Sequence, residues 1–539
     1  MITIVIIGYG LIIIYFIAHV VYIYYRKYLY YTLIFKGPRR KIYEHEHFTT
    51  LPLVVKNHIS EVALTLELAR RGHELVVITT DPVFHKTRPP YNISEIDVSF
   101  IYENFRKIQK VLYQAETIIA VDIYKMFLEL YIEEMKHPDV EKLIQDKSQK
   151  FDLIIIEGVL NYHLIFTEIF NAPVILMTSF NGLTENFEIV GAVAHHPIFY
   201  PSIMRKKFSN LTVIEKISEI KEEYEYMKVM HLVEEYENQL LKLKYGPNTP
   251  TVSELKNNVD FLFINSNQMF CNNRPVPSNV AFVGPLHLQP LKELPQELKS
   301  FLDNSKTGVI YVSLGTNVRP SLVNQELINS FLDTFEELPY NILWKFDKKV
   351  LKRIPKNVKI QEWFPQRDLL AHHNIKLFVM QGGLQSTDEA IDAGVPLVTI
   401  PILADQFFNA HKHVQFGIGL SLDVTTLNAK ILIDGIKKVI NDESYRENIR
   451  KLKEIINDQP QTPMERAVWW TEYVIRHKGA RHLRSPAANI SWAEYLMADV
   501  LIALAAIIFA STLAIVLVIR FVLKILLTIA IPYPKTKLN

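Results

Sequence analysis

Short runs of apolar residues recur along the chain and alternate with amphipathic stretches. In the first half, such runs occupy residues 51–56, 74–80, 151–158 and 172–179. A run that is apolar at every position is typical of a parallel strand that helices cover on both faces. Between the first two runs the pattern predicts a helix that begins at Ser60 and ends at Arg71, before Gly72. Together these elements predict an α/β lobe that starts with a βαβ unit.

A proline-rich connector precedes a second series of the same kind. Its prolines lie at positions 275, 277, 285, 290 and 295. Beyond it, the pattern predicts strands at residues 308–315, 341–346, 357–363, 375–380 and 395–402 and helices at 325–338 and 386–393. A charged helical segment at 205–245 interrupts the first series, and we interpret it as a solvated excursion. The predicted fold class is therefore α/β, with two Rossmann-like lobes facing a cleft.

The two ends of the chain carry the longest apolar segments. Residues 500–519 contain no charge, and twenty helical residues span about 30 Å, which is the thickness of a bilayer's hydrocarbon core. Basic residues follow, which favours a cytosolic tail and a lumenal body. Residues 2–25 are also apolar and are either a secretory signal or a retained anchor, and the basic residues after them favour the opposite orientation. Three sequons, beginning at Asn92, Asn210 and Asn489, favour the lumenal body.

Composition narrows the function classes. Lys and Arg total 59 and Asp and Glu total 57, so a formal charge of +2 gives no indication of a nucleic-acid surface. The single cysteine, Cys271, excludes an intramolecular disulfide and a Cys-rich zinc site, and we expect it to be a small buried hydrophobe. The predicted regions are an N-terminal hydrophobic segment with a basic linker (1–45), two α/β lobes (46–285 and 286–485), a juxtamembrane stretch (486–499), a transmembrane helix (500–519) and a basic tail (520–539).

Candidate chemistry lies at the carboxyl ends of the strands predicted in the second lobe, where open parallel sheets bind ligands. The strand at 375–380 ends in Gln381 and two glycines, and a helix opens at Ser386 and Thr387. Glycines let the backbone approach a ligand closely, and the free amides and dipole of a helix start bind an anion such as diphosphate. Thr316, after the first strand of this lobe, belongs to a second turn that we expect to face phosphate.

Further residues would complete a nucleotide-sugar site. The indole of Trp363 can stack on a flat base. Glu389 can accept hydrogen bonds from ribose hydroxyls, and Asp405 with Gln406 offers acceptors and donors for a sugar. A Gly-Gly turn that merely closes a strand–helix corner would not account for these residues occurring together.

The stretch from Trp363 to Gln406 resembles the donor-binding signature of the UDP-glycosyltransferase family, membrane-bound enzymes that conjugate small lipophilic molecules. Residues 265–287, 309–317 and 458–486 are similar to the insect branch of that family. The resemblance covers roughly residue 60 to the C-terminus. It implies a GT-B-like fold, a role in detoxification, and a single-pass glycoprotein of the endoplasmic reticulum membrane with a lumenal catalytic body and a short cytosolic tail.

The family's donor-binding residues can be transferred to the matching positions of this chain. They are Trp363 for uracil, Gln366 for the uridine, Glu389 for the ribose, Thr316, Gln381, Ser386 and Thr387 for the diphosphate, and Asp405 and Gln406 for the sugar hydroxyls. Many members carry His at the position of Gln381. Gln still donates a neutral hydrogen bond, although it cannot become cationic. The substitution also resembles the insect and insect-virus branch, so we do not interpret it as inactivating.

The resemblance also implies an inverting transfer that uses a general base and a carboxylate orienting it. The base would be His58, which follows the first predicted strand. Counted from the turn at 70–73, however, the family's His would fall on Asn57. The helix is therefore one residue shorter here, the N-terminus is atypical, or the segment is wrongly joined. Glu157 stands where the family commonly has Asp and is the candidate carboxylate, and Asp152 is the weaker candidate.

The predicted reaction moves a hexosyl group, expected to be glucose, from a UDP-sugar to a hydroxyl of a small lipophilic acceptor bound in the first lobe. No Asp-x-Asp motif occurs and helix amides face the diphosphate, so we expect no metal and no other cofactor. The Glu-His-Glu-His run at 44–47 is interpreted as a solvated patch.

An alternative is a catalytically impaired member that binds UDP-sugar or a lipophilic ligand, because His58 is out of register. A hydrolase is disfavoured because no Gly-x-Ser-x-Gly elbow occurs, and homo-oligomerisation stays open.

Overall fold

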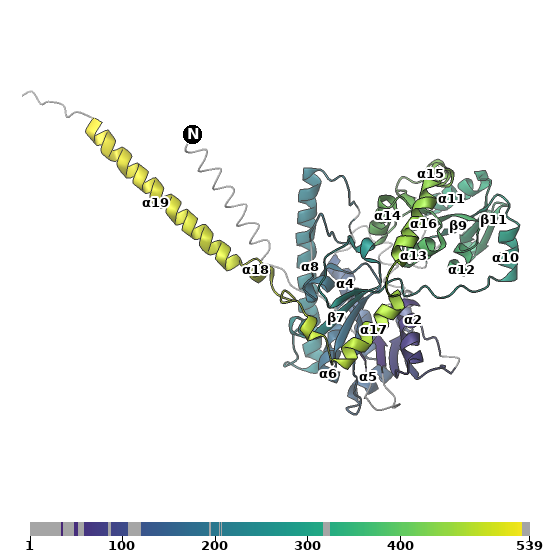
Figure 1. Cartoon of the computed structure of the whole chain (residues 1–539), viewed down its shortest axis with the longest axis horizontal. Helices are drawn as coiled ribbons and strands as arrows, with labels where there is room; N and C mark the ends of the chain where they lie inside the picture. The colour runs from purple at the N-terminus through teal and green to yellow at the C-terminus, as the bar shows by residue number, and fades with distance from the viewer. Residues whose placement is uncertain are drawn as a thin grey trace, which may run out of the picture. The chain divides into compact units, whose positions relative to one another are not determined.

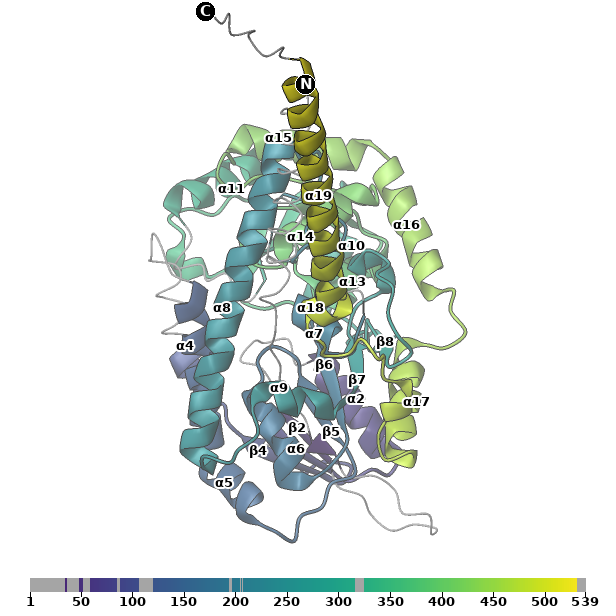
Figure 2. The same ribbon diagram turned by 90° about the vertical axis from the view of Figure 1, so that its left-hand side faces the viewer.

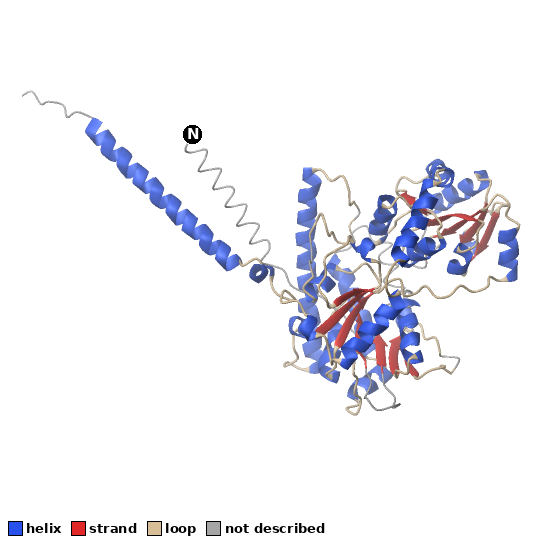
Figure 3. Ribbon diagram, in the orientation of Figure 1, coloured by secondary structure: helices blue, strands red, loops and turns tan. Residues whose placement is uncertain are grey.

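The computed structural model describes residues 34–35, 48–51, 59–84, 88–105, 120–192, 196–203, 205, 207–315 and 324–530. The chain divides into two compact units, one formed by Tyr28–Asn489 and the other by Met1–Lys27 with Ile490–Asn539. The larger unit contains two α/β lobes, whose strands are drawn in red in Figure 3.

An eight-stranded sheet forms the centre of the first lobe. Its strands, in spatial order, are β4 (Ile93–Asp97), β3 (Leu75–Thr79), β2 (Phe48–Leu51), β1 (Ile34–Phe35), β5 (Ile154–Glu157), β6 (Val174–Thr178), β7 (Val259–Ile264) and β8 (Val280–Phe282). The described pairings are parallel except those of β1, which is antiparallel to β2 and β5. The predicted strands that became β3, β5 and β6 are confirmed. The strand predicted at 51–56 begins earlier, as β2, and residues 52–58 lie outside the described part of the chain.

Helices pack against this sheet. They are α2 (Ile59–Arg70), α4 (Ala120–Met135), α5 (Pro138–Gln145), α6 (Phe166–Phe170), α7 (Thr184–Ile189), α8 (Val213–Tyr245) and α9 (Val252–Leu255). The long helix α8 runs beside α4 (Figure 2). Its charged sequence predicted a solvated helix, but Glu234 and Glu237 are buried. Lys256 Nζ donates to Glu234 at 2.7 Å, and Asn161 donates its backbone and side-chain N–H groups to Glu237. One face of α8 therefore belongs to the core of the lobe, where its acids have donors.

The second lobe contains a six-stranded sheet whose described pairings are all parallel. Its order is β11 (Val358–Gln361), β10 (Asn341–Lys345), β9 (Val309–Ser313), β12 (Ile375–Met380), β13 (Leu397–Thr399) and β14 (Gly419–Ser421). Its helices are α10 (Gln296–Asp303), α11 (Gln325–Glu337), α12 (Gln366–Leu370), α13 (Leu384–Ala393), α14 (Gln406–Gln415), α15 (Ala429–Asn441) and α16 (Ser444–Asn457). The predicted strands of this lobe are confirmed, and β14 is an addition. The strand order reverses between β9 and β12, which is where doubly wound sheets bind ligands.

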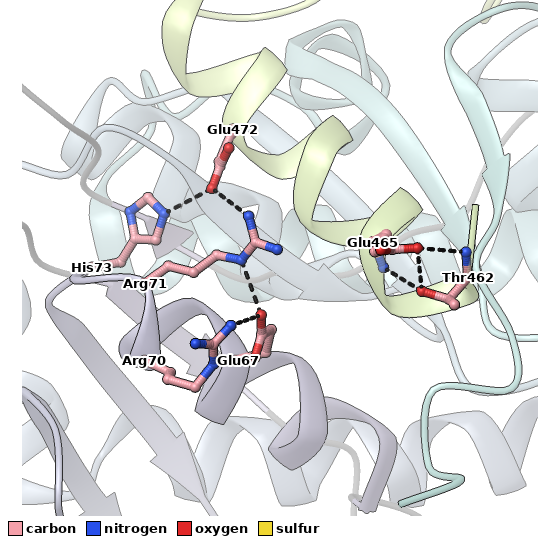
Figure 4. A network of polar contacts seen from close by, with 7 residues as sticks. All are labelled: Glu67, Arg70, Arg71, His73, Thr462, Glu465 and Glu472. Carbon is pink, nitrogen blue, oxygen red and sulfur yellow. Dashed lines mark hydrogen bonds and ion pairs between the residues drawn. The ribbon is translucent and has the colours of Figure 1, made fainter. Parts of the chain in front are cut away.

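The last helix of the larger unit, α17 (Pro463–Arg476), returns to the first lobe. Its buried apolar side chains belong to the core that surrounds the first sheet. Figure 4 shows Glu472 of α17 facing the turn after α2, where its carboxylate lies 3.7 Å from Arg71 Nη1 and 3.6 Å from His73 Nε2. Thus α17 falls in the range predicted for the second lobe, 286–485, but packs on the first. His73 thus has a structural contact with α17.

In the smaller unit, the described residues form α18 (Trp492–Tyr495) and α19 (Ala498–Ala530) (Figure 1). The segment Ala498–Leu527 contains an 18-residue window with a mean hydropathy of 2.9 and is long and apolar enough to cross a membrane. It contains the predicted transmembrane segment, 500–519, but the helix continues beyond Arg520 and Lys524. The apolar segment at 2–25 lies outside the described residues.

Candidate active site

Two tight glycine turns lie side by side where the strand order of the second lobe reverses. Gly315 follows β9 with φ +79°, and a Cβ at this position would lie 2.2 Å from Gln381 Nε2. Gly382 follows β12 with φ +97°, and a Cβ there would lie 2.9 Å from the carbonyl oxygen of Gln406. Both positions therefore require glycine, because other residues would meet strain and a close contact. Gln381 is 8% exposed, and its Oε1 has no hydrogen-bond partner in the described part of the chain.

The start of α13 offers an anion site next to these turns. The residue that precedes the helix is Gly383, and no side chain caps the first amides. Uncapped N–H groups at the positive end of a ten-residue helix favour a negatively charged ligand. The helix start is therefore suited to an anion, and the diphosphate site expected here stays a prediction.

Gln366, the first residue of α12, links several of the predicted donor-binding residues. Its Nε2 donates to Ser386 Oγ at 2.8 Å and to Glu389 Oε2 at 2.6 Å. Its Oε1 accepts a 3.1 Å hydrogen bond from the hydroxyl of Tyr311, which lies in β9. Burial raises the pKa of Glu389 to about 7, while the hydrogen bond from Gln366 acts in the opposite direction. These contacts gather residues from β9, α12 and α13 at one place.

Trp363 lies at the same end of the sheet and is 62% exposed. The ammonium of Lys345, the last residue of β10, lies 4.6 Å from the centroid of its ring system and donates to the carbonyl oxygen of Gly315 at 3.3 Å. A cation over the ring restrains the indole, and its large exposed area can stack on a flat base.

Thr387 differs from its neighbours on α13. It is completely buried, and its hydroxyl donates to the carbonyl oxygen of Gly383 at 3.0 Å. Thr387 Oγ1 also lies 3.0 Å from His413 Nε2, and His413 Nδ1 lies 2.8 Å from Thr399 Oγ1. Burial lowers the pKa of His413 to about 3, so this imidazole is neutral. The structure thus turns the Thr387 hydroxyl into the core and does not bring it together with Ser386 and Glu389.

Asp405 and Gln406 follow β13, and both side chains are buried. Ala404, immediately before them, has φ +55°, a left-handed conformation that is costly for a residue with a Cβ and that is often found at functional sites. Gln406 Oε1 accepts hydrogen bonds from the backbone N–H groups of residues 402 and 403. Its Nε2, a donor, therefore points away from these groups. Asp405 Oδ2 accepts a 2.8 Å bond from Asn409 Nδ2. Burial raises the pKa of Asp405 to about 6, and the bond from Asn409 opposes this shift.

Glu157 ends β5 in the first lobe and is 5% exposed. Its two carboxylate oxygens accept 3.1 Å hydrogen bonds from the backbone N–H and the hydroxyl of Ser179, which follows β6. Asp152 lies before β5, at the other end of the strand, and is exposed. The structure therefore places Glu157, and not Asp152, at the carboxyl edge of the sheet. His58 and Thr316 lie outside the described residues.

Sequence reasoning missed Tyr311, Lys345 and Asn409. Only Asn409 had a readable signal, because it lies one helical turn after Asp405 on the same helix. No group of three or more His, Cys, Asp or Glu that could hold a metal ion occurs among the residues that the structure describes. Cys271 is buried, and burial raises the pKa of its thiol to about 12, so it has the character of a packed hydrophobe.

Residues 50–531 match the family described as UDP-glucoronosyl and UDP-glucosyl transferase. An ecdysteroid UDP-glucosyltransferase of Spodoptera littoralis nuclear polyhedrosis virus is 38% identical over 469 residues, which cover 82% of this chain and 90% of the viral protein. UDP-glucosyltransferase 2 of the insect Dactylopius coccus is 30% identical over 459 residues, which cover 83% and 87% of the two chains.

Solved structures resemble the fold at lower sequence identity. A UDP-glucose:anthocyanidin 3-O-glucosyltransferase in complex with UDP aligns with a TM-score of 0.54 and 18% identity, covering 80% of this chain and 99% of that one. The glycotransferase of kitacinnamycin aligns with a TM-score of 0.55 and 17% identity, covering 79% and 98%. These neighbours confirm the two-lobed GT-B architecture predicted from the sequence.

The family match spans almost the whole chain, and the relatives include an insect enzyme and enzymes of insect viruses, as the sequence motifs indicated. The chain belongs to the UDP-glucoronosyl and UDP-glucosyl transferase family and is a UDP-sugar-dependent glycosyltransferase.

Proposed function

We propose that the enzyme transfers glucose from UDP-glucose to a hydroxyl group of a small lipophilic acceptor and inverts the configuration at the anomeric carbon. The observation that supports UDP-sugar as the donor is that Gln366 hydrogen-bonds both Ser386 and Glu389 beside an exposed Trp363. Glucose and a steroid-like acceptor are inferred from relatives that are named ecdysteroid UDP-glucosyltransferases.

The nucleoside would be held by complementary surfaces in the second lobe. The uracil would stack on Trp363, and Gln366 would contact the uridine. The Glu389 carboxylate would accept hydrogen bonds from the ribose hydroxyls, which it does best when it is ionised, above about pH 7.

The diphosphate and the sugar would lie next to the glycine turns. The first amides of α13, with Gln381, Ser386, Thr387 and Thr316, would stabilise the diphosphate without a metal ion. Thr387 would act only indirectly, by stabilising the first turn of the helix, because its hydroxyl is bonded inside the lobe and its backbone N–H donates to the carbonyl oxygen of Gly383. Asp405 would accept hydrogen bonds from sugar hydroxyls and Gln406 Nε2 would donate one.

The chemical step would use the first lobe. His58 would take the proton from the acceptor hydroxyl as its oxygen forms a bond to the anomeric carbon. The bond from that carbon to the phosphate oxygen breaks, and UDP leaves with the electron pair. Glu157 would orient the imidazole and stabilise its positive charge, and Ser179 would in turn hold Glu157 through two hydrogen bonds.

The cellular placement follows from the apolar helix. We propose that α19 anchors the protein in the endoplasmic reticulum membrane, with the two lobes in the lumen and a short cytosolic tail. In that orientation Asn92 and Asn210, which are exposed, would accept glycans. Asn489 is a poorer acceptor because its Nδ2 donates to the Ser253 carbonyl oxygen at 3.0 Å and to Asn257 Oδ1 at 2.9 Å.

The test is transfer of label from radiolabelled UDP-glucose by microsomes that contain the full chain, with an ecdysteroid, other steroids and phenols as acceptors. We expect a glucoside of inverted anomeric configuration, with kcat lowered on the order of a thousandfold in Glu157→Ala and in His58→Ala while UDP binding is retained. Asp152→Ala is the matched control and should transfer at the rate of the wild type. If the wild type binds UDP but glycosylates none of these acceptors, the binding-protein alternative replaces this proposal.

A further inference from the structure

The two lobes contact each other through a pair of buried asparagines. Asn181, in the segment after β6 of the first lobe, donates from Nδ2 to Oδ1 of Asn409, on α14 of the second lobe, at 2.9 Å. Asn181 is 3% exposed and Asn409 is completely buried. A hydrogen bond between two neutral groups that water does not reach fixes their relative position, because breaking it would leave both polar groups unsatisfied.

The side chain of Asn409 can take only one orientation. Its Nδ2 donates to the carbonyl oxygen of Gly382 at 2.9 Å and to Asp405 Oδ2 at 2.8 Å, which uses both amide hydrogens. Its Oδ1 is thereby turned toward Asn181. If the amide were flipped, its oxygen would face the oxygens of Gly382 and Asp405, and its N–H groups would face the Nδ2 of Asn181. Asn409 therefore joins the glycine turn, the sugar-binding carboxylate and the other lobe in one group.

Asn181 is held just as firmly on the side of the first lobe. Its Oδ1 accepts a 2.7 Å hydrogen bond from Ser266 Oγ, and its carbonyl oxygen accepts one from the Cys271 thiol at 3.2 Å. Ser266 and Cys271 follow β7, the strand next to β6. The donors run in one direction, from Ser266 to Asn181, then to Asn409 and finally to Asp405.

The segment that carries Asn181 also holds the proposed catalytic carboxylate. Ser179, two residues earlier, donates its N–H and its hydroxyl to Glu157. A single short stretch, residues 179–181, therefore contacts Glu157 in its own lobe and, through Asn409, Asp405 in the other. Glu157 is the carboxylate of the proposed catalytic pair, which it forms with the general base, and Asp405 belongs to the proposed sugar site.

We infer that Asn181 and Asn409 are positioning residues that set the donor sugar, held by Asp405, at the correct distance and angle to the acceptor-activating pair that contains Glu157. This inference rests on the proposed function and adds to it residues that touch neither substrate. Reaction between groups held by separate lobes depends on sub-ångström placement, and a displacement of about 1 Å can cost on the order of a hundredfold in rate.

The two residues should differ in their kinetic effects. Asn181→Ala leaves the bonds from Asn409 to Gly382 and Asp405 in place, so KM for UDP-glucose should be unchanged while kcat falls on the order of tenfold to a hundredfold. Asn409→Ala also releases Asp405, so KM for UDP-glucose should rise as kcat falls. The affinity for UDP, which lacks the sugar, should be that of the wild type in Asn181→Ala, whereas Asn409→Ala also frees the Gly382 turn beside the diphosphate and should lower it.

Two further variants separate hydrogen bonding from packing. Asn181→Asp keeps the shape of the side chain but turns an oxygen toward Asn409 Oδ1, and should lower kcat at least as much as Asn181→Ala. In the double variant of Asn181→Ala and Asn409→Ala, the loss of kcat should not exceed that of Asn409→Ala alone, because both changes remove the same contact.

The matched control is Asn258→Ala. Asn258 is a half-buried residue just before β7 in the first lobe, and its Nδ2 donates to Thr167 Oγ1 at 2.9 Å and to Glu168 Oε1 at 3.1 Å. This variant should lose thermal stability and keep the kcat of the wild type.

The inference is overturned if Asn181→Ala keeps the kcat of the wild type or if the two losses add in the double variant. If Asn409→Ala does not fold, Asn181→Ala and Asn181→Asp decide the question. A wild type that transfers no sugar at all contradicts the proposed function itself, which is a separate outcome.

Discussion

The two lobes form their parts of the active site in different ways. In the second lobe, the proposed donor site comes mainly from one contiguous stretch of sequence, Trp363 to Gln406, and several of its side chains are linked by hydrogen bonds within that lobe. In the first lobe, the proposed base and carboxylate, His58 and Glu157, are far apart in the sequence and follow different strands. The second site can therefore form from local structure, whereas the first depends on how several loops are arranged.

This difference has a consequence for catalysis. Binding of UDP should depend on the second lobe alone, and the rate of transfer should depend on both. Variants of the first lobe that lower the rate of transfer without changing UDP binding would support these separate roles. A variant of the first lobe that changes UDP binding would contradict them.

The largest effect on donor binding should come from Gly315→Ala. Alanine at φ +79° costs about 1–2 kcal/mol, and its Cβ would displace the Gln381 amide, which lies 2.2 Å from that position. We expect KM for UDP-glucose to rise on the order of tenfold to a hundredfold, as measured by initial rates at saturating acceptor.

Gly246→Ala is the control for backbone strain alone. Gly246 has φ +103° at the end of α8 in the first lobe, and a Cβ there would meet nothing within 4 Å. This variant should lose a similar amount of stability with no change in KM for UDP-glucose. Equal effects of the two variants on KM would show that the contact with Gln381 is unimportant.

A smaller effect should appear in the pH dependence of UDP affinity. Burial raises the pKa of Glu389 to about 7, so its carboxyl group is ionised above that pH and protonated below it. The protonated group is a weaker acceptor for ribose hydroxyls, so UDP affinity, measured by calorimetry, should fall as the pH decreases through about 7.

Gln366→Ala sharpens this prediction. It removes the hydrogen bond that lowers the pKa of Glu389, so the loss of affinity should move to higher pH, with a decrease on the order of tenfold even at alkaline pH. Gln325→Ala is the matched control, since Gln325 is partly exposed at the start of α11 and donates to Asn329 on the same helix. An affinity for UDP that is constant across neutral pH in the wild type would contradict the role of Glu389.

The parts of the molecule that were predictable from the sequence are those with local signals. The strands of the second lobe are continuous apolar runs, and the two glycines after one of them predicted the turn and the helix start that the structure shows. Even the burial of Thr387 had a signal, because Ala390 and Ile391, three and four residues later, lie on the same helical face and are buried.

Contacts over long sequence distances had no such signal. Asn181 and Asn409 are 228 residues apart, and nothing in the local pattern around either residue indicates the other. The return of α17 to the first lobe was also missed, because an amphipathic helix shows which face is buried but not which lobe buries it. The outcome for His58 and Thr316 stays a prediction, because both lie outside the described residues.

The smallest effect should come from Glu472→Ala, which tests whether the lobes bind their ligands independently. Glu472 connects α17 to Arg71 and His73 of the first lobe, and the contact with His73 lowers its pKa (Figure 4). These pairs are partly exposed, so the variant should lose about 1 kcal/mol of unfolding free energy or less, measured by urea titration. Because the pKa is depressed, this contribution is present at neutral pH and is lost as the pH falls through the folded-state pKa, where variant and wild type should converge. Glu336→Ala, which removes an exposed ion pair with Arg353 in the second lobe, is the control. Affinity for UDP should be unchanged in both variants, and a loss of UDP affinity in Glu472→Ala would mean that the first lobe shapes the donor site after all.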